Sequence, residues 1–227
     1  MVETKTNIQI LASGSEGNQT VFEYNGKYFV VDAGVNYFSA PVSQTEAIFI
    51  THGHHDHAKY RHYYQERGYN VMGWFEDKRF FEVKDRSNKN VKPINMGTFS
   101  ILVVSTRHGV WINHALIVHN NITREKFFYA TDLHELPAIF FSIKNKFDKI
   151  LIEINYDIET LDKDNSINLS HMYSKLHSHL SFETFVEQKV IEKSDEFIIL
   201  HFNPKYLNIE KVREYFEKNN KKVFFFL

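Results

Sequence analysis

Five short apolar runs of the chain each end in a histidine or an aspartate, and this feature constrains the fold more than any other. The five residues at these ends, in chain order, are Asp32, His52, His108, Asp132 and His201. Runs rich in β-branched and aromatic residues predict strands. Strand ends in an α/β fold meet at one edge of a sheet, where binding sites form. Buried imidazoles and carboxylates need partners there, so the pattern predicts a metal site at a sheet edge.

The composition limits which ligands and compartments are available. The chain has 227 residues, with 43% hydrophobic and 24% charged residues, which is ordinary for a soluble globular protein. Its formal net charge of -1 gives no basic field for nucleic acid or an anionic membrane. It contains no cysteine, so only His, Asp and Glu remain as ligands. The opening "MVETKTNIQI" lacks the apolar segment of a leader, and we expect a cytoplasmic protein.

The predicted elements form one layered arrangement. The expected strands cover 7–13, 20–26, 27–34, 47–53, 99–108, 114–120, 126–132, 149–155, 197–202 and 222–227. The expected helices cover 57–68, 133–146, 182–193 and 209–219. Strands first, followed by strands alternating with helices, predict an α/β domain in which helices cover the sheets. We expect a single domain over residues 1–227, because the chain shows no linker and no internal repeat.

The stretch "THGHHDH" carries four histidines and an aspartate directly after the apolar run "EAIFI". His52 and His54 are two residues apart, so both rings can face one ion in an extended turn. Asp56 and His57 follow where a helix would begin, and they can face a second ion. His55 would point away from both. The spacing therefore predicts half of a site for two metal ions.

Later strand ends supply the other half of this predicted site. His108 would complete the first ion's ligands, His201 the second's, and Asp132 would bridge both ions. His114 is an alternative to His108, and His134 is a further candidate for the lining of the cleft. Zinc accepts this mixture of nitrogen and oxygen ligands, and manganese or iron also fits. Two such ions can activate water and clamp a phosphoryl or carbonyl centre.

These residues resemble a known signature. "HGHHDH" matches the His-x-His-x-Asp-His motif of the metallo-β-lactamase superfamily, and the three later ligand candidates follow in that family's order over residues 10–203. Asp32 and Gly34 resemble the family's Asp-x-Gly strand end. The resemblance implies a four-layer αββα sandwich of class α/β, two zinc ions, and hydrolysis by a hydroxide that bridges them, with Asp56 among the catalytic residues.

Shorter elements resemble one branch of that family. "LHFNPKY" is similar to the His-Phe-Ser-Pro-Arg-Tyr element of ribonuclease Z, and "HSHLSFETF" to its Gly-His-Leu-Ser/Thr segment, which would place His179 near the metals. "GSEGN" and "LIEINYD" look more like the small ribonuclease-Z-like exonucleases and the phage anti-Pycsar cyclic-nucleotide phosphodiesterases. The chain departs from ribonuclease Z at Ser178, Asn203 and Lys205, and it lacks a long basic arm for tRNA.

Two residues outside the ligand set are assigned roles in the chemistry. His179, beside Ser181, is the candidate general acid for the leaving alkoxide, and the alternative is a surface histidine near a helix start. Glu153 ends a predicted strand, where it either orients a histidine ligand or makes structural hydrogen bonds. Ser181 and Asp32 are further candidates for contacts that support the ligands or the substrate.

Three functions remain open at this point. Small nucleotide phosphodiesters, above all cyclic nucleotides, are the favoured substrates, because the near-neutral chain lacks the basic track of a nuclease. By resemblance, such an activity would serve immune evasion in the cytoplasm of a phage's host. The first alternative is a ribonuclease-Z-like nuclease acting on single-stranded RNA or DNA. The second is a non-catalytic protein that sequesters a nucleotide.

The segment 154–179 is predicted to be a long loop. Loops of this length in compact domains are usually functional or disordered. Tyr156, Met172 and Tyr173 would then pack on a neighbour or reach toward a bound base. The resemblance also implies a two-fold homodimer in which one subunit helps to close the other's site.

Overall fold

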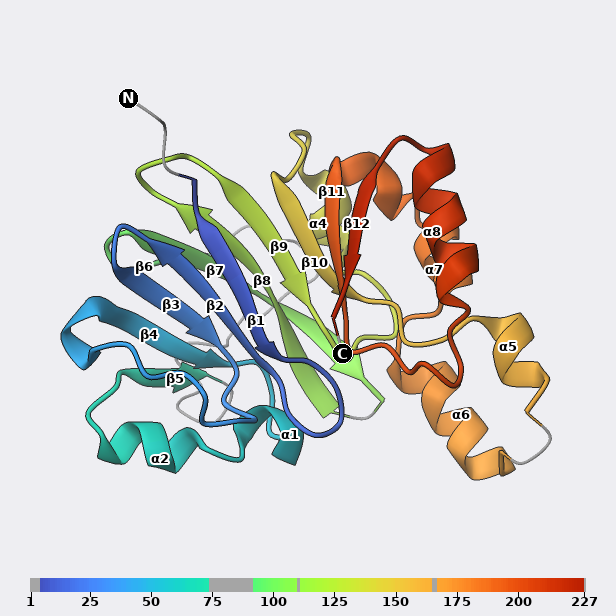
Figure 1. Cartoon of the computed structure of the whole chain (residues 1–227), viewed down its shortest axis with the longest axis horizontal. Coiled ribbons are helices and arrows are strands. Elements are labelled where there is room, and N and C mark those ends of the chain that lie inside the picture. Colours follow the sequence, from blue (N-terminus) through green and yellow to red (C-terminus); the bar gives the residue numbers. More distant parts are fainter. Residues whose placement is uncertain (1–4, 74–91, 110, 165–166, 227) are drawn as a thin grey trace. The chain divides into compact units, whose positions relative to one another are not determined.

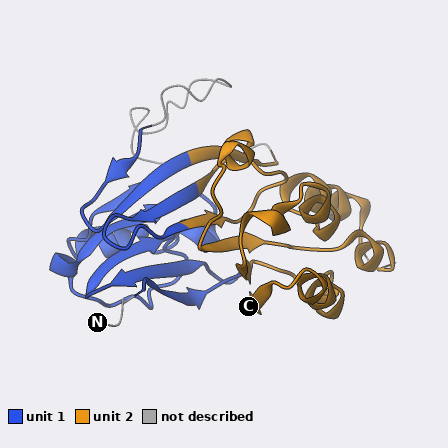
Figure 2. Cartoon of the chain, turned by 90° about the horizontal axis from the view of Figure 1, so that it is seen from above, with its two compact units in different colours: residues 1–103, 116–126 blue, residues 104–115, 127–227 orange. Residues whose placement is uncertain are grey.

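The computed structural model describes residues 5–73, 92–109, 111–164 and 167–226. Its architecture is α/β, with one five-stranded and one seven-stranded sheet and helices along the chain between strands (Figure 1). The chain forms two compact units, Met1–Val103 with Leu116–Lys126 and Val104–Ala115 with Phe127–Leu227 (Figure 2). We call them unit 1 and unit 2. Among the described residues, no helix has both the length and the apolar character needed to cross a membrane.

Unit 1 contains the five-stranded sheet, whose order is β1-β2-β3-β4-β5. Its strands are β1 (Asn7–Ala12), β2 (Gln19–Tyr24), β3 (Lys27–Val31), β4 (Thr45–Ile50) and β5 (Val71–Gly73). The pairs from β1 to β3 are antiparallel, and those from β3 to β5 are parallel. The sequence predicted the first four strands, but β5 was missed because its three residues are too few to show a pattern.

Two helices of unit 1 are anchored by a buried tyrosine and by a backbone hydrogen bond. Tyr64, on α2 (Arg61–Glu66), is fully buried, and its hydroxyl lies 3.1 Å from Gln19 Nε2. The predicted helix 57–68 is divided into α1 (His55–Ala58) and α2. Tyr60 separates them in a non-helical conformation, and its backbone N–H donates to the carbonyl of Ala33. This bond ties the end of α1 to the residues that follow β3.

The seven-stranded sheet has the order β12-β11-β10-β9-β8-β7-β6. Its strands are β6 (Ile94–Asn95), β7 (Phe99–His108), β8 (Trp111–Asn120), β9 (Lys126–Ala130), β10 (Lys149–Glu153), β11 (Glu196–Leu200) and β12 (Lys222–Phe225). The strands β9 to β12 pair in parallel and, apart from Lys126 at the start of β9, lie in unit 2. Parallel strands bury both faces, which explains why β10 and β11 read as nearly continuous apolar runs.

Unit 2 contains five α-helices among its described residues. They are α4 (Ala138–Ser142), α5 (Ile158–Asp162), α6 (Leu169–Ser178), α7 (Phe182–Glu187) and α8 (Ile209–Lys218). Of these, α4, α7 and α8 pack on the parallel strands of the unit. The ring of Phe197 on β11 lies 6.0 Å from Phe185 of α7 and 5.0 Å from Phe216 of α8. The predicted helix 133–146 is limited to α4, which starts only after Pro137. Proline disfavours helix in the residue before it, so an earlier start is unfavourable.

The prediction that 154–179 is a loop is wrong, because the segment contains α5 and α6. Asp157 caps α5 by accepting a hydrogen bond from the backbone N–H of Thr160. Tyr156 and Leu161 are buried in one cluster, on which Met172 packs. Both helices are short and lie in a polar stretch, so their apolar residues do not repeat often enough to reveal a helical pattern. Tyr156 and Met172 therefore stabilise unit 2 rather than reach outward.

Candidate metal centre

In unit 1, the predicted ligands come from the turn after β4 and the start of α1. His52 and His57 are buried, His54 and Asp56 are partly buried, and His55 is exposed. The ring of His52 has its centroid 4.7 Å from that of His54 and 4.2 Å from that of His57. The structure thus brings three of these imidazoles together within six residues of chain.

Asp32 holds this stretch from the end of β3. It is fully buried and has a left-handed backbone conformation with φ of 65°. One carboxylate oxygen accepts a hydrogen bond from His57 Nδ1 at 2.7 Å. The other accepts from the backbone N–H and the hydroxyl of Thr51, each at 2.8 Å. Because a carboxylate only accepts, His57 carries its proton on Nδ1 and keeps a lone pair on Nε2, as a metal ligand requires.

Gly34 and Asn18 fix the backbone of Asp56. A Cβ atom at Gly34 would lie 1.7 Å from the carbonyl oxygen of Asp56, so only glycine fits there. The backbone N–H of Asn18 donates to that same carbonyl at 2.7 Å. The Asn18 amide also lies 3.2 Å from the Asp56 carboxylate and 3.0 Å from His57 Nε2. Sequence reasoning missed Asn18, although it ends the quoted element "GSEGN".

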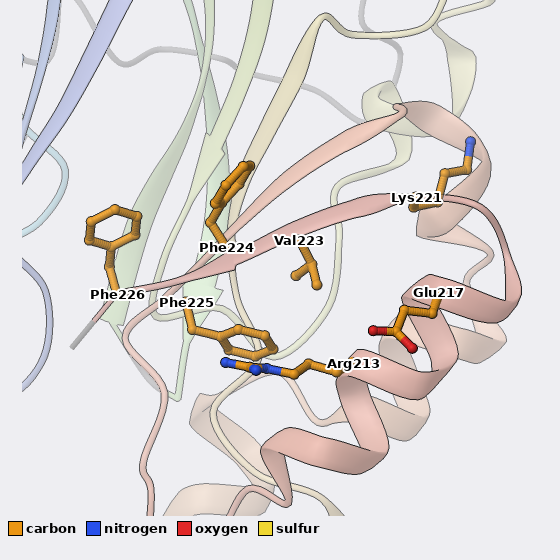
Figure 3. A pocket seen from close by; sticks show the side chains of 7 residues that line it. All are labelled: Arg213, Glu217, Lys221, Val223, Phe224, Phe225 and Phe226. Atoms are coloured by element: carbon orange, nitrogen blue, oxygen red, sulfur yellow. The ribbon is translucent and has the colours of Figure 1, made fainter.

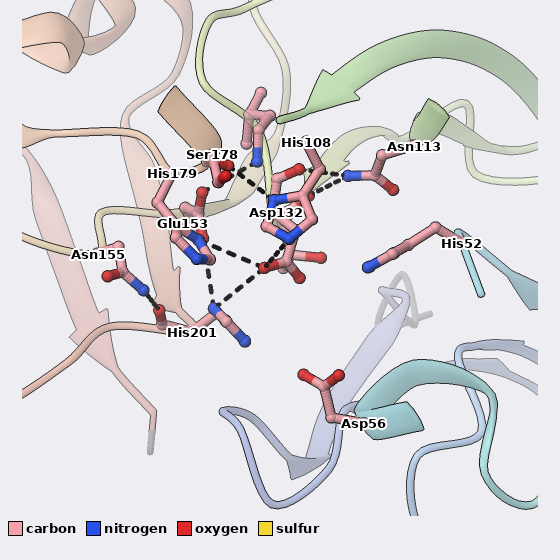
Figure 4. A network of polar contacts seen from close by, with 12 residues as sticks. His52, Asp56, His108, Asn113, Asp132, Glu153, Asn155, Ser178, His179 and His201 are labelled. Carbon is pink, nitrogen blue, oxygen red and sulfur yellow. Dashed lines mark hydrogen bonds and ion pairs between the residues drawn. The ribbon is translucent and has the colours of Figure 1, made fainter. Parts of the chain in front are cut away.

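In unit 2, two carboxylates and two imidazoles converge. Each of Asp132, Glu153, His179 and His201 offers a ligand atom, and these atoms lie within 4.8 Å of one another (Figure 4). The four residues follow or end β9, β10, α6 and β11, respectively. Two predicted metal ligands therefore lie beside the predicted general acid and the predicted supporting acid. All four are buried or partly buried.

Glu153 joins the members of this cluster. It is fully buried, and one of its oxygens accepts the backbone N–H groups of Leu133 and Leu180, each at 3.0 Å. The other lies 3.1 Å from His179 Nδ1 and 3.3 Å from His201 Nδ1. Burial raises the pKa of Glu153, but the neighbouring imidazoles of His179 and His201 outweigh burial and lower that pKa to about 2. Glu153 thus makes both structural and histidine-orienting contacts, the two roles left open by the sequence.

His108 is held in a similar way at the end of β7. Its Nδ1 donates to the carbonyl oxygen of Ser178 at 2.8 Å, which leaves the lone pair on Nε2. Nε2 lies 3.9 Å from an Asp132 carboxylate oxygen. The next residue, Gly109, has φ of 58°, and a Cβ atom there would lie 3.0 Å from the Ser178 hydroxyl. Glycine at this position allows β7 and α6 to approach closely.

Two buried amide side chains hold the backbone of the strand-end ligands. Asp132 and His201 have φ of 53° and 47°, which is uncommon for residues other than glycine. Asn113 donates to the carbonyl of Asp132 at 2.7 Å, and Asn155 donates to the carbonyl of His201 at 2.7 Å. Such strained positions persist where the surroundings over-determine them. Both asparagines were missed, because an isolated Asn in a sequence gives no signal of this kind.

Lys175 of α6 extends this support. It is buried, and its ammonium group donates to the Asn155 side-chain oxygen at 2.8 Å. Burial lowers the pKa of Lys175, while the carboxylates of Glu153 and Asp132 oppose that shift. A buried lysine that orients an amide next to His201 was not expected from the sequence. Ser181, a candidate for a supporting or substrate contact, caps α7 by accepting a hydrogen bond from the backbone N–H of Thr184.

A separate cavity of unit 2 has a different chemistry. It lies between α8 and β12, has a volume of about 420 Å³, and is lined in part by Arg213, Glu217 and Phe225 (Figure 3). The guanidinium carbon of Arg213 lies 5.3 Å from the centre of the Phe225 ring. Its lining includes no histidine, so it does not offer the ligand chemistry of the clusters above.

The donor sets fit a divalent cation. Asp132 and Glu153 bring two carboxylates into one buried cluster, where a cation would offset their repulsion. His57 and His108 donate from Nδ1 to a carboxylate and a carbonyl, the usual arrangement behind imidazoles that bind metal through Nε2. The mixture of nitrogen and oxygen donors suits zinc, manganese or iron.

Comparisons with known proteins agree with this fold. The sequence matches no family model and no curated protein. Among solved structures, it is similar to the metallo-β-lactamase fold protein YhfI from Bacillus subtilis, with a TM-score of 0.67, 15% identity, and coverage of 98% of this chain and 97% of that one. Yeast PDE1 gives a TM-score of 0.66 at 10% identity, with 97% of both chains covered.

The short form of human tRNase Z is also similar, with a TM-score of 0.61, 14% identity, and coverage of 87% of this chain and 93% of that one. At such identities, these likenesses concern the fold. They agree with the two mixed sheets and with the strand-end position of the histidines and carboxylates. The chain has the metallo-β-lactamase fold.

Proposed function

We propose that this protein is a metal-dependent phosphodiesterase that hydrolyses small nucleotide phosphodiesters. The observation that carries the proposal is the buried cluster of Asp132, Glu153, His179 and His201 in unit 2. It combines metal-binding groups with an imidazole that is held by an ionised carboxylate. That combination suits hydrolysis in which a leaving oxygen must be protonated. The fold shared with human tRNase Z and yeast PDE1 supports this choice of chemistry.

The proposed centre holds two divalent ions, with zinc as the first choice and manganese or iron as alternatives. His52, His54 and His108 would bind one ion, and Asp56, His57 and His201 the other, with Asp132 shared by both. The tautomers of His57 and His108 support their assignment as ligands through Nε2. When bound, the ions would lower the pKa of water and offset the negative charge of the phosphoryl oxygens.

The chain's own residues would position the water and move the proton. Asp56, fixed by Asn18 and Gly34, would orient the attacking water, so its backbone anchors support the reaction. His179 faces Glu153 through Nδ1, which leaves Nε2 as the atom that would donate a proton to the leaving oxygen. Water adds to phosphorus, the P–O bond to the leaving oxygen breaks, and that oxygen takes a proton. In a cyclic mononucleotide, the new phosphomonoester and the new hydroxyl group stay on one product molecule.

Cyclic mononucleotides are the proposed substrates within this class. The formal net charge of -1 supports a small substrate over a long nucleic acid, which requires many basic contacts. The elements "GSEGN" and "LIEINYD" resemble both the cyclic-nucleotide phosphodiesterases and the small ribonuclease-Z-like exonucleases, so they are compatible with this choice but do not decide it. The competing proposal, a nuclease for single-stranded RNA or DNA, is favoured by "LHFNPKY" and by the fold of tRNase Z.

The test is a comparison of substrates with the purified protein loaded with zinc or manganese. We expect cyclic mononucleotides to be opened faster than short single-stranded oligonucleotides are cleaved, with metal content near two ions per chain. His179→Ala should lower turnover roughly 10²-fold. Cleavage of oligonucleotides alone would replace our substrate by the nuclease alternative. Nucleotide binding without any hydrolysis would favour sequestration, and failure to bind metal would overturn the proposal.

We also propose a two-fold homodimer, in which the partner subunit helps to cover each site. The support is the resemblance to ribonuclease-Z-like proteins, together with an exposed apolar side chain at the start of α6. This side chain is Leu169, which is 84% exposed. Light scattering at micromolar concentration is expected to give a dimer mass. A monomer mass with full activity would contradict the shared site.

A further inference from the structure

Three exposed ring side chains of unit 2 stack outside the ligand set. They are His134, Tyr173 and His177, and Tyr173 is 65% exposed. The Tyr173 and His177 rings, one turn apart on α6, have centroids 3.9 Å apart and planes 24° apart. The His134 and His177 rings are nearly parallel, with planes 11° apart and centroids 6.2 Å apart. We call these three residues the ring cluster.

The backbone places the ring cluster next to the candidate metal centre. His134 follows Asp132 by two residues, and its backbone N–H donates to the carbonyl of Arg107 at 3.3 Å. His177 precedes His179 by two residues and is followed by Ser178, whose carbonyl accepts from His108. Both members of the parallel imidazole pair are therefore anchored within two residues of a candidate ligand or of the candidate acid.

The side chains themselves are held in register. His177 Nδ1 lies 2.9 Å from the carbonyl oxygen of Tyr173, to which it donates, so the imidazole cannot turn without losing this bond. Tyr173 covers one side of that imidazole. His134, on a different segment, presents a plane parallel to it. These rings are flat, unsaturated surfaces that face solvent. None of the hydrogen bonds described above for Glu153 or for the candidate ligands uses their side chains.

We propose that the ring cluster binds the base of a nucleotide substrate, with His134 and His177 as the stacking residues. Every nucleobase has a flat π-face, so stacking on aromatic rings recognises a base without a fixed sequence. A base lies one sugar away from the phosphate that the metal centre would hold. A flat ligand also matches parallel ring planes better than an aliphatic chain does. This inference rests on the proposed function, because it names what that site recognises beside the phosphate.

The experiment compares two diesters that differ only in the base. One is adenosine 3′,5′-cyclic phosphate, and the other is the methyl riboside 3,5-cyclic phosphate, which carries a methoxy group in place of adenine. In His177→Ala and His134→Ala, we expect KM for the adenosine compound to rise roughly 10-fold with kcat nearly unchanged. The constants for the methyl riboside should remain those of the wild type. His177→Phe should restore most of the affinity, because it restores a ring.

Binding provides a readout that does not depend on turnover. Calorimetry with adenosine 5′-monophosphate should show roughly 10-fold weaker binding to His177→Ala, while binding of ribose 5-phosphate is unchanged. His62→Ala, which removes an exposed imidazole from α2 in unit 1, is the matched control and should behave as the wild type. Unchanged adenosine binding in both ring variants would overturn the inference. An equal loss of affinity for adenosine 5′-monophosphate and ribose 5-phosphate would also overturn it.

The outcomes separate this inference from the proposed function. Suppose that the wild type hydrolyses neither diester, but that His177→Ala binds adenosine 5′-monophosphate more weakly than the wild type does. The catalytic proposal then fails, and base recognition stands. If it hydrolyses both diesters equally well and the ring variants change nothing, the phosphodiesterase stands and base recognition is wrong. Thermal unfolding of each variant checks that exposed substitutions leave the fold intact.

Discussion

The candidate ligands of unit 1 and unit 2 reach their positions by opposite routes. In unit 1, the four candidates lie within the six-residue stretch from His52 to His57, and one acid, Asp32, anchors the stretch. In unit 2, they come from strand and helix ends spread between His108 and His201. A continuous stretch needs few anchors because neighbouring residues share one backbone path. A dispersed set needs a separate anchor for each member.

The anchors differ accordingly. Unit 1 relies on a close backbone approach at Gly34 and on the two oxygens of Asp32. Unit 2 relies on buried side chains, with Asn113 and Asn155 on backbone carbonyls and Glu153 between two histidines. The comparison teaches that the candidate ligands of unit 2 depend on tertiary packing. Each of them relies on a separate residue outside the candidate ligand set.

The largest expected effect is the loss of a carboxylate ligand in either unit. Asp132→Ala and Asp56→Ala should each lower turnover roughly 10³-fold or more, since both remove charge from the proposed reaction centre. If Asp132 is shared, its loss should reduce metal content further than the loss of Asp56 does. Elemental analysis of the purified variants and initial rates measure both effects. Asp195→Ala, an exposed aspartate paired with Lys146, is the control. Equal metal content in both site variants would contradict the shared role.

The next effect tests the close approach in unit 1. Gly34→Ala would place a Cβ atom 1.7 Å from the Asp56 carbonyl oxygen. We expect a loss of roughly 1–3 kcal/mol in the free energy of unfolding, together with a loss of activity, because Asp56 must move. Gly26→Ala is the control, because its new Cβ would have no atom within 4 Å, although Gly26 itself has φ of 72°. It should keep activity. Denaturant unfolding and initial rates measure both effects. Normal activity in Gly34→Ala would show that the close approach at Gly34 is not needed to position Asp56.

Substitution of the dispersed anchors of unit 2 should have a smaller effect. It should lower the affinity for metal more than the free energy of unfolding. Asn113→Ala and Asn155→Ala remove the amide that holds a left-handed ligand, and supporting contacts of this type are worth roughly 10- to 100-fold in metal affinity. In unit 1, Gln19→Ala removes a longer 3.3 Å bond to the Asp32 carbonyl, so its effect on metal affinity should be less. Competition with a chromogenic chelator measures the affinities. Asn121→Ala, an amide outside the site, is the control.

The same contrast explains how much of the molecule the sequence predicted. All described strands except the short β5 and β6, and the His52–His57 stretch, were recognised because both features are local. Apolar runs end at turns, and the ligand candidates of the stretch lie within six residues. The dispersed candidates were identified only because polar residues recur at strand ends and resemble a family order. They converge in unit 2 because β9, β10 and β11 pair in parallel. Strands that alternate with helices predict such an α/β arrangement, but they do not predict which strands are neighbours.

Residues that act through a single long-range contact could not be predicted. Asn18, Asn113 and Asn155 each hold a backbone atom that is distant in sequence, and asparagine is common in turns for other reasons. Lys175 reads as an ordinary solvated helix residue until its burial is known. The helices α5 and α6 were missed for a related reason, since a cap and a small cluster stabilise them.

The smallest expected effect concerns that cap and the acid sensitivity of unit 2. Asp157 is buried, and it accepts hydrogen bonds from the backbone N–H groups of Thr160 and Asn208. Lys211 lies 3.3 Å away. Burial raises the pKa of Asp157, but these contacts outweigh burial, and the pKa lies below its ordinary value. Its stabilisation is therefore complete above the unfolded pKa of about 3.9 and is lost as the pH falls toward the folded pKa.

Asp157→Asn keeps the size and the capping oxygen but loses the charge. We expect it to lower the free energy of unfolding by roughly 1–2 kcal/mol at pH 7. The difference from the wild type should narrow below about pH 4, because the wild-type carboxyl then loses its charge too. Thermal unfolding at pH 7, 5 and 3.5 measures this. Glu159→Gln, in an exposed pair with Lys163, should show almost no difference at pH 7. A difference for Asp157→Asn that stays constant over this range would mean that the charge of Asp157 does not account for the stabilisation.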